Sequence, residues 1–184
     1  MKLTETDLRG VLIIEPRSFG DDRGYFMETW NESRYGSEKI PTRFVQDNVS
    51  FSKKGVLRGL HFQNPKPQGK LVSVLQGEVF DVVVDLRIDS PTFKKWWGTN
   101  LSSENKKQVF IPPGFAHGFL VLSESALFFY KCTDFYSPES ELTLLWNDPE
   151  VGINWPMKNP VVSEKDARGL KLAEIEKGRL FRKQ

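Results

Sequence analysis

Two histidines carry the clearest chemical signal in this chain, and His61 and His117 are its only ones. His61 lies in the stretch VLRGLHFQ at residues 56–63, and His117 closely follows the turn Pro112-Pro113-Gly114. An imidazole with a pKa of about 6.5 exchanges protons near neutral pH, so each histidine is a candidate general base or acid. The alternative for a single histidine among apolar strand residues is a hydrogen-bonded place in the core. The proline-glycine turn fixes the backbone before His117, which favours a site.

The stretch at residues 56–63 mixes strand formers with polar residues. Its apolar residues suit a half-buried strand, whereas Arg58 and His61 are costly to bury without partners. In strict alternation these two side chains point to opposite faces of the strand. Gly59 lies between them and can host a β-bulge, which shifts the alternation by one residue. We therefore predict an irregularity at Gly59 that lets both side chains converge on one site.

The same two histidines bear on metal binding. The segment Pro112-x-Gly114-x-x-His117 resembles the second motif of cupins, which are small double-sheet jelly rolls. Metal-binding cupins carry a His-x-His pair in their first motif, and the matching place here reads His61-Phe62-Gln63. Two histidines cannot make a three-histidine site, although two histidines and a carboxylate remain an alternative. We predict no metal, with neutral His61 free to act as a base.

Short strand-like runs dominate the rest of the chain. They are expected at residues 11–15, 25–30, 44–49, 56–63, 70–75, 78–86, 96–101, 108–111, 118–122, 126–133 and 142–146. A hairpin turn is predicted at Gln76-Gly77. Short strands about ten residues apart favour an all-β sandwich or barrel.

The strand predicted at residues 78–86 alternates in an informative way. One face is apolar and carries Phe80, Val82, Val84 and Leu86. The other face mixes Val79 and Val83 with Asp81 and Asp85. This second face is either exposed to solvent or part of a barrel interior polar enough to bind a ligand.

Helical signals are few. Short helices are predicted at residues 29–35 and 163–168, the latter with Ser163 as N-cap, and a C-terminal helix at residues 170–181. We expect a single domain over residues 1–184, with a jelly-roll core at about 7–150 and a helical extension at about 160–184.

Composition excludes several classes of protein. The formal net charge of +2 gives no reason to expect a nucleic-acid partner. No apolar run approaches the ~20 residues of a membrane helix, and the segment MKLTETDLRG lacks the apolar region of a signal peptide. The single cysteine, Cys132, excludes an internal disulfide and favours a reducing compartment. We expect a cytoplasmic protein.

Eight motifs in order make the functional signal specific. They are FGDDRG at 19–24, FVQDN at 44–48, VLRGLHFQ at 56–63, QGKL at 68–71, GEVFDV at 77–82, IPPGFAHGF at 111–119, YKCTDFY at 130–136 and LWND at 145–148. Together they resemble the dTDP-4-dehydrorhamnose 3,5-epimerase family from about Asp7 to Leu170. The resemblance implies a cupin-like jelly roll and a cofactor-independent isomerase. No Gly-x-Gly-x-x-Gly dinucleotide fingerprint is present in the sequence, which agrees with this.

The resemblance implies a substrate and a chemistry. The substrate is dTDP-4-keto-6-deoxy-D-glucose, and inversion at C3 and C5 gives dTDP-4-keto-L-rhamnose. The C4 ketone acidifies the hydrogens on both neighbouring carbons, so one base can serve both centres. The resulting enolate needs a nearby donor or positive charge, and an acid on the opposite face returns the proton.

The resemblance also implies residue roles. His61 is the base, Asp166 orients its imidazole, Tyr130 is the acid, and Lys70 stabilises the enolate or holds the sugar. Substrate contacts are implied for Arg23, Glu28, Gln46, Asp47, Asn48, Arg58, Lys70, His117, Tyr136, Glu141 and Lys165. Among these, the arginines suit a diphosphate and Tyr136 suits stacking on thymine. By the residues alone, Tyr130 fits a core aromatic, Lys70 a solvated strand end and Asp166 a charge at a helix N-terminus.

Members of the family form dimers in which N-terminal strands pair across the interface. Arg23 and Glu28 are therefore expected to serve the neighbouring protomer's site. Two other classes stay open: a metal-dependent cupin, and a jelly roll that binds sugar without catalysis. The opposed base and acid argue against simple binding.

Overall fold

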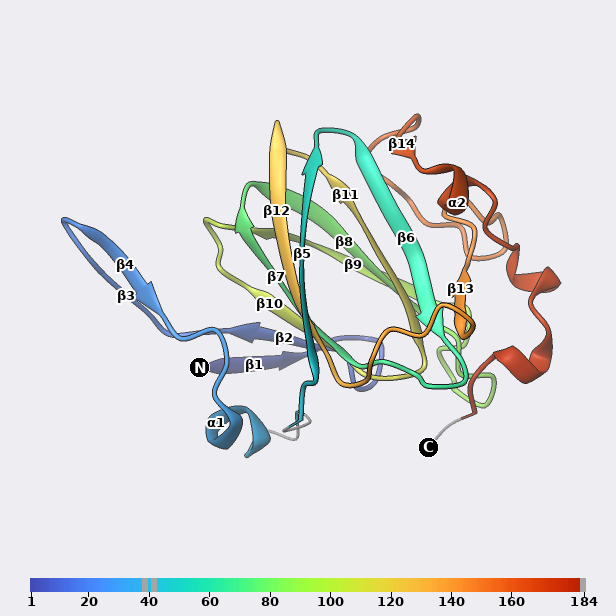
Figure 1. Ribbon diagram of the computed structural model, residues 1–184, viewed down its shortest axis with the longest axis horizontal. Coiled ribbons are helices and arrows are strands. Elements are labelled where there is room, and N and C mark those ends of the chain that lie inside the picture. The colour runs from blue at the N-terminus through green and yellow to red at the C-terminus, as the bar shows by residue number, and fades with distance from the viewer. Residues whose placement is uncertain (38–39, 41–42, 183–184) are drawn as a thin grey trace.

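The computed structural model describes residues 1–37, 40 and 43–182 of the chain. Two facing, mainly antiparallel sheets form its body (Figure 1). In spatial order, the first sheet contains β1 (Lys2–Glu5), β2 (Leu12–Glu15), β10 (Gln108–Ile111), β7 (Lys70–Gln76), β12 (Ser125–Cys132) and β5 (Gln46–Lys53). The second sheet contains β13 (Glu141–Thr143), β6 (Val56–Gln63), β11 (Phe115–Val121), β8 (Glu78–Asp85) and β9 (Trp96–Ser102), with β14 (Val161–Val162) parallel to β6.

The chain passes back and forth between these two sheets, which is the jelly-roll arrangement that the sequence predicts. The hairpin expected at Gln76-Gly77 is wrong, because β7 belongs to the first sheet and β8 to the second. Gly77 is instead the crossing point, with a φ of 81°. A Cβ on Gly77 would lie 2.1 Å from the Ser125 carbonyl oxygen, so the crossing requires glycine.

A hydrophobic core fills the space between the two sheets. Val79 and Val83 of β8 pack there with Phe119 of β11 and Phe128 of β12. Asp81 lies on the same face of β8 and is also fully buried. The mixed apolar and acidic face of this strand is therefore the interior of the barrel, and the alternative of a solvent-exposed face is wrong.

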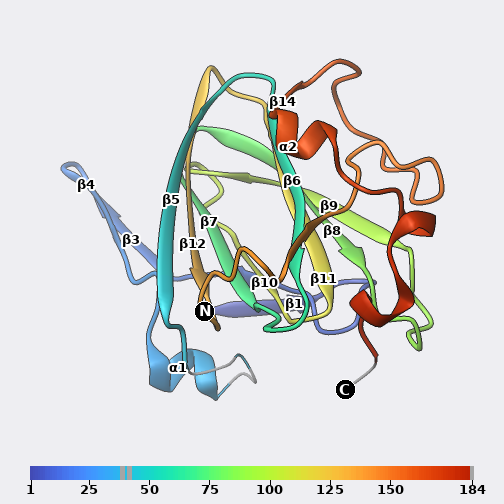
Figure 2. The same cartoon turned by 45° about the vertical axis from the view of Figure 1, so that its right-hand side comes forward.

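The outer face of each sheet is covered by a different part of the chain. Apolar residues of β6, β8 and β11 pack beneath the C-terminal segment, which contributes Leu172, Ile175 and Leu180. The outer face of the first sheet packs beneath α1 (Glu32–Gly36), where Tyr35 contacts Ile14 and Phe110. Figure 2 shows α1 and the C-terminal segment on opposite sides of the barrel.

The C-terminal helix predicted at residues 170–181 is wrong. The segment contains two 3₁₀ turns, η1 (Leu172–Glu174) and η2 (Lys177–Arg179), separated by extended residues. Its buried side chains, Leu172, Ile175 and Leu180, have a spacing that also fits one face of a helix, so the sequence pattern alone does not exclude a helix. Burial against the second sheet outweighs the helix propensity of this charged segment.

The other two predicted helices are present with shifted bounds. α2 (Glu164–Ala167) begins after Ser163, whose Oγ accepts a hydrogen bond from the Asp166 amide as expected for an N-cap. α1 starts three residues later than predicted, because Asn31 rather than an earlier residue caps it.

A two-stranded hairpin stands apart from the two sheets. It consists of β3 (Ser18–Asp21) and β4 (Gly24–Met27), and it projects away from the barrel (Figure 1). The predicted strand at residues 25–30 corresponds only to β4. The strands β1, β3 and β14 were not among those predicted, because their short segments lack a clear apolar alternation. No helix among the described residues is long and apolar enough to cross a membrane.

Candidate active site

A cavity opens at one end of the barrel interior, between the two sheets. Its walls come from β5, β6, β7, β12, β13 and the loop after β12. The lining residues are Gln46, Asn48, His61, Phe62, Gln63, Gln68, Lys70, Tyr130, Cys132, Tyr136 and Glu141. Many polar side chains thus converge in one place from segments that are far apart in the sequence.

The backbone of β6 is irregular at Gly59, as the sequence predicts. Against β11, His61 pairs with His117 and Arg58 pairs with Phe119, so two residues of β6 oppose the single residue Gly118. This is a β-bulge, and it changes the alternation between Arg58 and His61. A Cβ on Gly59 would lie 2.6 Å from the Gly118 Cα, so a larger residue does not fit.

His61 is paired with a buried carboxylate. Its Nε2 lies 2.6 Å from Asp166 Oδ1, and the side chain is 30% exposed while that of Asp166 is 5% exposed. Asp166 Oδ2 accepts a second hydrogen bond from the Gly59 amide at 3.3 Å. Burial opposes ionisation of Asp166, but its hydrogen bonds and the nearby imidazole lower its pKa below the ordinary value. An ionised Asp166 fixes the orientation of the imidazole ring.

Tyr130 and Lys70 lie on the opposite wall from His61, because β12 and β7 belong to the first sheet and β6 to the second. Burial raises the pKa of the Tyr130 hydroxyl, which keeps its proton at neutral pH. Burial also lowers the pKa of the Lys70 ammonium, and the nearby Cys132, Glu141 and Asp81 only partly oppose this. The cavity therefore has a proton acceptor on one wall and a proton donor facing it.

His117 lies deeper than His61 and is also paired. Its Nε2 is 2.8 Å from Asp81 Oδ2, and both side chains are buried within the barrel. Its ring stacks 6.0 Å from that of Phe128. The other carboxylate oxygen of Asp81, Oδ1, is buried and has no hydrogen-bond partner among the described residues. His117 is thus a buried polar residue on the same face of the second sheet as His61, its partner in the register between β11 and β6.

Glu141 lies at the edge of the cavity and forms a hydrogen-bonded cluster with Tyr136 and Lys165. Glu141 accepts hydrogen bonds from the Tyr136 hydroxyl at 2.8 Å and from Lys165. Burial opposes ionisation of Glu141, yet these two donors lower its pKa. Lys165 precedes Asp166 in α2, so this contact joins the helix that carries Asp166 to the loop that carries Tyr136.

Two predicted binding residues lie near the cavity without lining it. Arg58 is exposed, and its guanidinium donates to Ser52 Oγ at 2.9 Å and to the Phe51 carbonyl oxygen at 3.4 Å. Asp47 alternates to the opposite face of β5 from Gln46 and Asn48, where it pairs with Lys131 at 2.7 Å. The structure thus brings Gln46 and Asn48 into the cavity and directs Asp47 away from it.

Arg23 and Glu28 lie outside the cavity of their own chain. Arg23 is in the turn of the projecting hairpin, where it pairs with Asp21 at 2.6 Å. Glu28 follows β4 and pairs with Arg34 at 3.1 Å.

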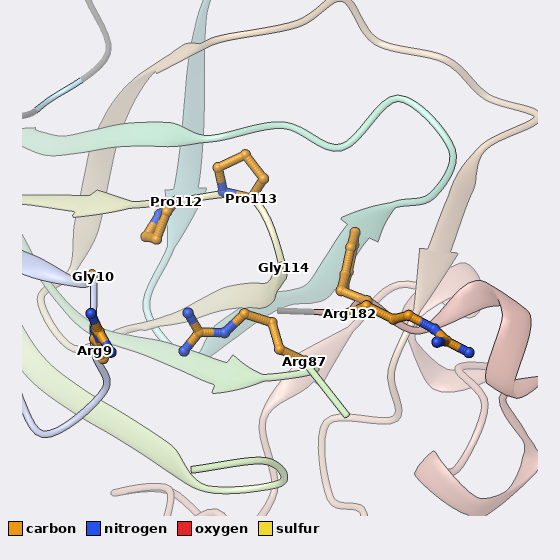
Figure 3. A pocket seen from close by; sticks show the side chains of 8 residues that line it. Arg9, Gly10, Arg87, Pro112, Pro113, Gly114 and Arg182 are labelled. Atoms are coloured by element: carbon orange, nitrogen blue, oxygen red, sulfur yellow. The ribbon is translucent and has the colours of Figure 1, made fainter. Parts of the chain in front are cut away.

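Figure 3 shows a second cavity, next to the turn that leads into β11. It is lined by Arg9, Gly10, Arg87, Pro112, Pro113, Gly114, Phe181 and Arg182. Arginine keeps its proton at neutral pH, and Arg87 already pairs with Asp85 at 2.7 Å. None of the described residues that line this cavity is therefore suited to acid-base chemistry.

The residues that the structure describes contain no group of three or more His, Cys, Asp and Glu side chains placed to hold a metal ion. Each histidine is instead bonded to a single aspartate. The chemistry that this arrangement supports is proton removal by His61 and proton delivery from the facing wall.

A family model described as dTDP-4-dehydrorhamnose 3,5-epimerase matches residues 5–174. The chain belongs to this family. The relative of that name from Pseudomonas aeruginosa is 54% identical over 178 residues, which are 96% of this chain and 98% of the relative. A 3,5-epimerase from Legionella pneumophila, solved in complex with dTDP-4-keto-L-rhamnose, matches with a TM-score of 0.96 and 53% identity, covering 100% of this chain and 98% of its own.

Membership of the dTDP-4-dehydrorhamnose 3,5-epimerase family confirms the predicted resemblance, the jelly-roll fold and the isomerase class. Five residues of the site were not predicted as part of it: Phe62, Gln63, Gln68 and Cys132 line the cavity, and Asp81 bonds to His117. Cys132 lies two residues after Tyr130 on β12 and therefore on the same face of the strand, a pattern that could have identified it as a site residue. Asp81 was placed on the right face of its strand but not paired with His117. The sequence motif identifies Gln63 only as the residue at the place where metal-binding cupins carry a second histidine.

Proposed function

We propose that this chain converts dTDP-4-keto-6-deoxy-D-glucose into dTDP-4-keto-L-rhamnose by inverting C3 and C5, without a metal or other cofactor. Family membership supports the reaction. The complex of the Legionella pneumophila relative with dTDP-4-keto-L-rhamnose supports the class of ligand. The reaction belongs to the biosynthesis of dTDP-L-rhamnose. The lone Cys132, buried and unpaired within the described chain, favours the reducing cytoplasm as its location.

One observation carries the mechanism: His61, bonded to Asp166, and Tyr130 lie on facing walls of one cavity. His61 removes the hydrogen from the carbon next to the C4 ketone, and the electrons move onto the ketone oxygen to form an enolate. Tyr130 then donates its proton to the opposite face of that carbon, which inverts it. Protonated His61 then releases its proton to solvent and the Tyr130 phenolate regains one from solvent. The same pair can therefore act at the second carbon, which flanks the same ketone.

Charge on the enolate oxygen needs a fixed positive group or donor. Lys70 lies on the wall that also carries Tyr130, and His117 lies deeper on the wall that carries His61. In this proposal Lys70 and His117 face the ketone oxygen, and Asp81 holds the His117 ring in place at 2.8 Å. Gln46, Asn48, Glu141 and Lys165 contact the nucleotide sugar, while Arg58 binds the diphosphate and Tyr136 stacks on thymine. Asp47 pairs with Lys131 on the opposite face of β5, away from the cavity.

The direct test is to identify the product. Purified protein is incubated with dTDP-4-keto-6-deoxy-D-glucose, and the sugar is reduced chemically and analysed for the configuration at C3 and C5. The proposal predicts inversion at both carbons. Inversion at C3 alone would make the protein a 3-epimerase, and an unchanged sugar that still binds would make it a sugar-binding jelly roll.

We also propose that two copies of this chain form a dimer through the projecting hairpin. A lone two-stranded hairpin is at best marginally stable in water. This one exposes Phe19, Tyr25 and Phe26, the last of them 71% exposed. The edge strand β5 exposes Val49 and Phe51 on the outer face of the first sheet. A second copy would cover both apolar surfaces and protect the β5 edge.

The dimer would bring Arg23 to the neighbour's cavity, and mixing two variants tests this. Arg23→Ala and His61→Asn proteins are each expected to have little activity. Mixed dimers contain one site that combines an intact His61 with the partner's intact arginine, so random exchange should restore about one quarter of the sites. Activity in the mixture is compared with each variant alone after subunit exchange. A mixture no more active than the sum of its parts contradicts a shared site, and so does sedimentation of the wild type as a monomer.

Activity is expected to survive exhaustive treatment with a chelator. The proposed chemistry uses only protein side chains, and His61 and His117 each already bond to an aspartate. Turnover is measured after dialysis against the chelator, with the metal content determined in parallel. Lost turnover that a divalent ion restores would favour the metal-dependent alternative.

A further inference from the structure

Gln63 is a buried polar residue that the proposed reaction does not use. It is 4% exposed and ends β6, two residues after His61. Its position is the one at which metal-binding cupins carry the second histidine of the His-x-His pair. The side chain lies on the same face of β6 as His61 and borders the same cavity.

All of the polar atoms of the Gln63 side chain are engaged with backbone. Its Oε1 accepts a hydrogen bond from the Ser137 amide at 3.0 Å. Its Nε2 donates to the Phe135 carbonyl oxygen at 3.2 Å and to the Lys66 carbonyl oxygen at 2.8 Å. The reverse orientation would place the amide donors against a donor and the acceptor against two acceptors, so the network fixes the side chain.

Two of these partners, Phe135 and Ser137, flank Tyr136 in the sequence. Gln63 holds the carbonyl before Tyr136 and the amide after it, and Gln46 Oε1 accepts from the amide of Tyr136 itself at 2.8 Å. The Tyr136 ring is exposed, and its hydroxyl bonds to Glu141. The backbone that places this ring is therefore fixed largely by two glutamine side chains.

We propose that Gln63 is a positioning residue that holds Tyr136 as a platform for the nucleobase. The inference rests on the proposed function, in which Tyr136 stacks on thymine. Gln63 acts on nucleotide affinity through Tyr136 and does not touch the reacting carbons. The third bond, to Lys66, ties the same side chain to the loop between β6 and β7, so both loops at the mouth of the cavity depend on it.

The test uses Gln63→Met, which keeps the length of the side chain and removes all three hydrogen bonds. The dissociation constant of dTDP is measured by calorimetry, and kcat and KM are measured with the nucleotide sugar. We expect the dissociation constant and KM to rise about tenfold, which is within the range that stacking of a base on an aromatic ring contributes. We expect kcat to change by less than about threefold, because none of the three hydrogen bonds of Gln63 involves His61 or Tyr130.

A second variant and a control make the test specific. Gln63→Glu keeps an acceptor for the Ser137 amide but loses both donors, and it should weaken dTDP binding in the same direction. Glu139→Gln removes an exposed ion pair with Lys66 at 3.1 Å that links the same two loops. Exposed pairs contribute little, so this control should bind dTDP within about twofold of the wild type.

A double variant separates positioning from general stabilisation. If Gln63 acts through Tyr136, then Gln63→Met should weaken dTDP binding no further in a Tyr136→Ala background. Equal losses in both backgrounds would overturn the inference, as would wild-type affinity in both Gln63 variants, loss of the fold in both, or a fall in kcat at constant KM. A wild type that does not bind dTDP would instead refute the proposed function.

Discussion

Replacing His61 by asparagine is expected to abolish exchange of the hydrogens at both C3 and C5 with solvent. The proposed mechanism uses one base for both carbons, so the loss should be of the same size at each. Removal of a general base costs about 10²–10⁴ in rate. Exchange is measured by NMR of the substrate in deuterium oxide, with the signals of the two positions followed separately.

Asp166 keeps its hydrogen bond from the Gly59 amide in this variant, so the fold and the binding of dTDP should be unchanged. Equal affinity of variant and wild type for dTDP is the control that the cavity is intact. If one carbon still exchanges at the original rate, a second base exists and the assignment of His61 to both centres is wrong.

Replacing Tyr130 by phenylalanine should separate proton removal from inversion. The variant keeps the ring that packs 6.0 Å from Phe128 and loses only the hydroxyl. His61 can still form the enolate, which then takes a proton back from the His61 side and returns to starting material. Deuterium from solvent should enter recovered substrate, while inverted product falls by about 10² or more, the scale for losing a general acid.

Two other outcomes for this variant would contradict the assignment. A folded protein that loses both substrate exchange and product would show that Tyr130 has a role other than delivering the proton. Full turnover would make Tyr130 a core aromatic residue, the alternative suggested by its neighbours Phe128 and Phe129. In the wild type, burial raises the pKa of the Tyr130 hydroxyl, so at neutral pH it holds the proton that the mechanism requires it to deliver.

The strands with regular alternation were predictable from the sequence, because period-two patterns reflect which face is buried. The bulge at Gly59 was predictable for a different reason. The sequence predicts that Arg58 and His61 share a site, which strict alternation would prevent. The bulge is present in the structure, although Arg58 does not line the cavity. In both cases, residues that are close together in the sequence were enough to predict the structure.

Features that depend on distant contacts were not predictable in this way. The crossing at Gly77 has the composition of a hairpin turn, and only the sheet partners of β7 and β8 distinguish the two. The segment at residues 170–181 has helix-forming residues, but packing on the second sheet decides its structure. The direction of Asp47 depends on the register of β5 against β12, where Asp47 is opposite Lys131.

The contacts within the candidate site also join distant segments, so the residues alone do not predict them. His61 and Asp166 were connected only through the family resemblance, because 105 residues separate them in the chain. The hydrogen bonds of Gln63 to the residues around Tyr136 join segments more than 70 residues apart, and no spacing in the sequence indicates them.

The central claim is that one cavity inverts two carbons by exchanging their hydrogens with solvent. The most direct measurement is turnover of unlabelled substrate by the wild-type protein in deuterium oxide, followed by NMR and mass analysis of the product. The account predicts dTDP-4-keto-L-rhamnose that carries deuterium at both C3 and C5. Inverted product with hydrogen retained at either carbon would contradict it.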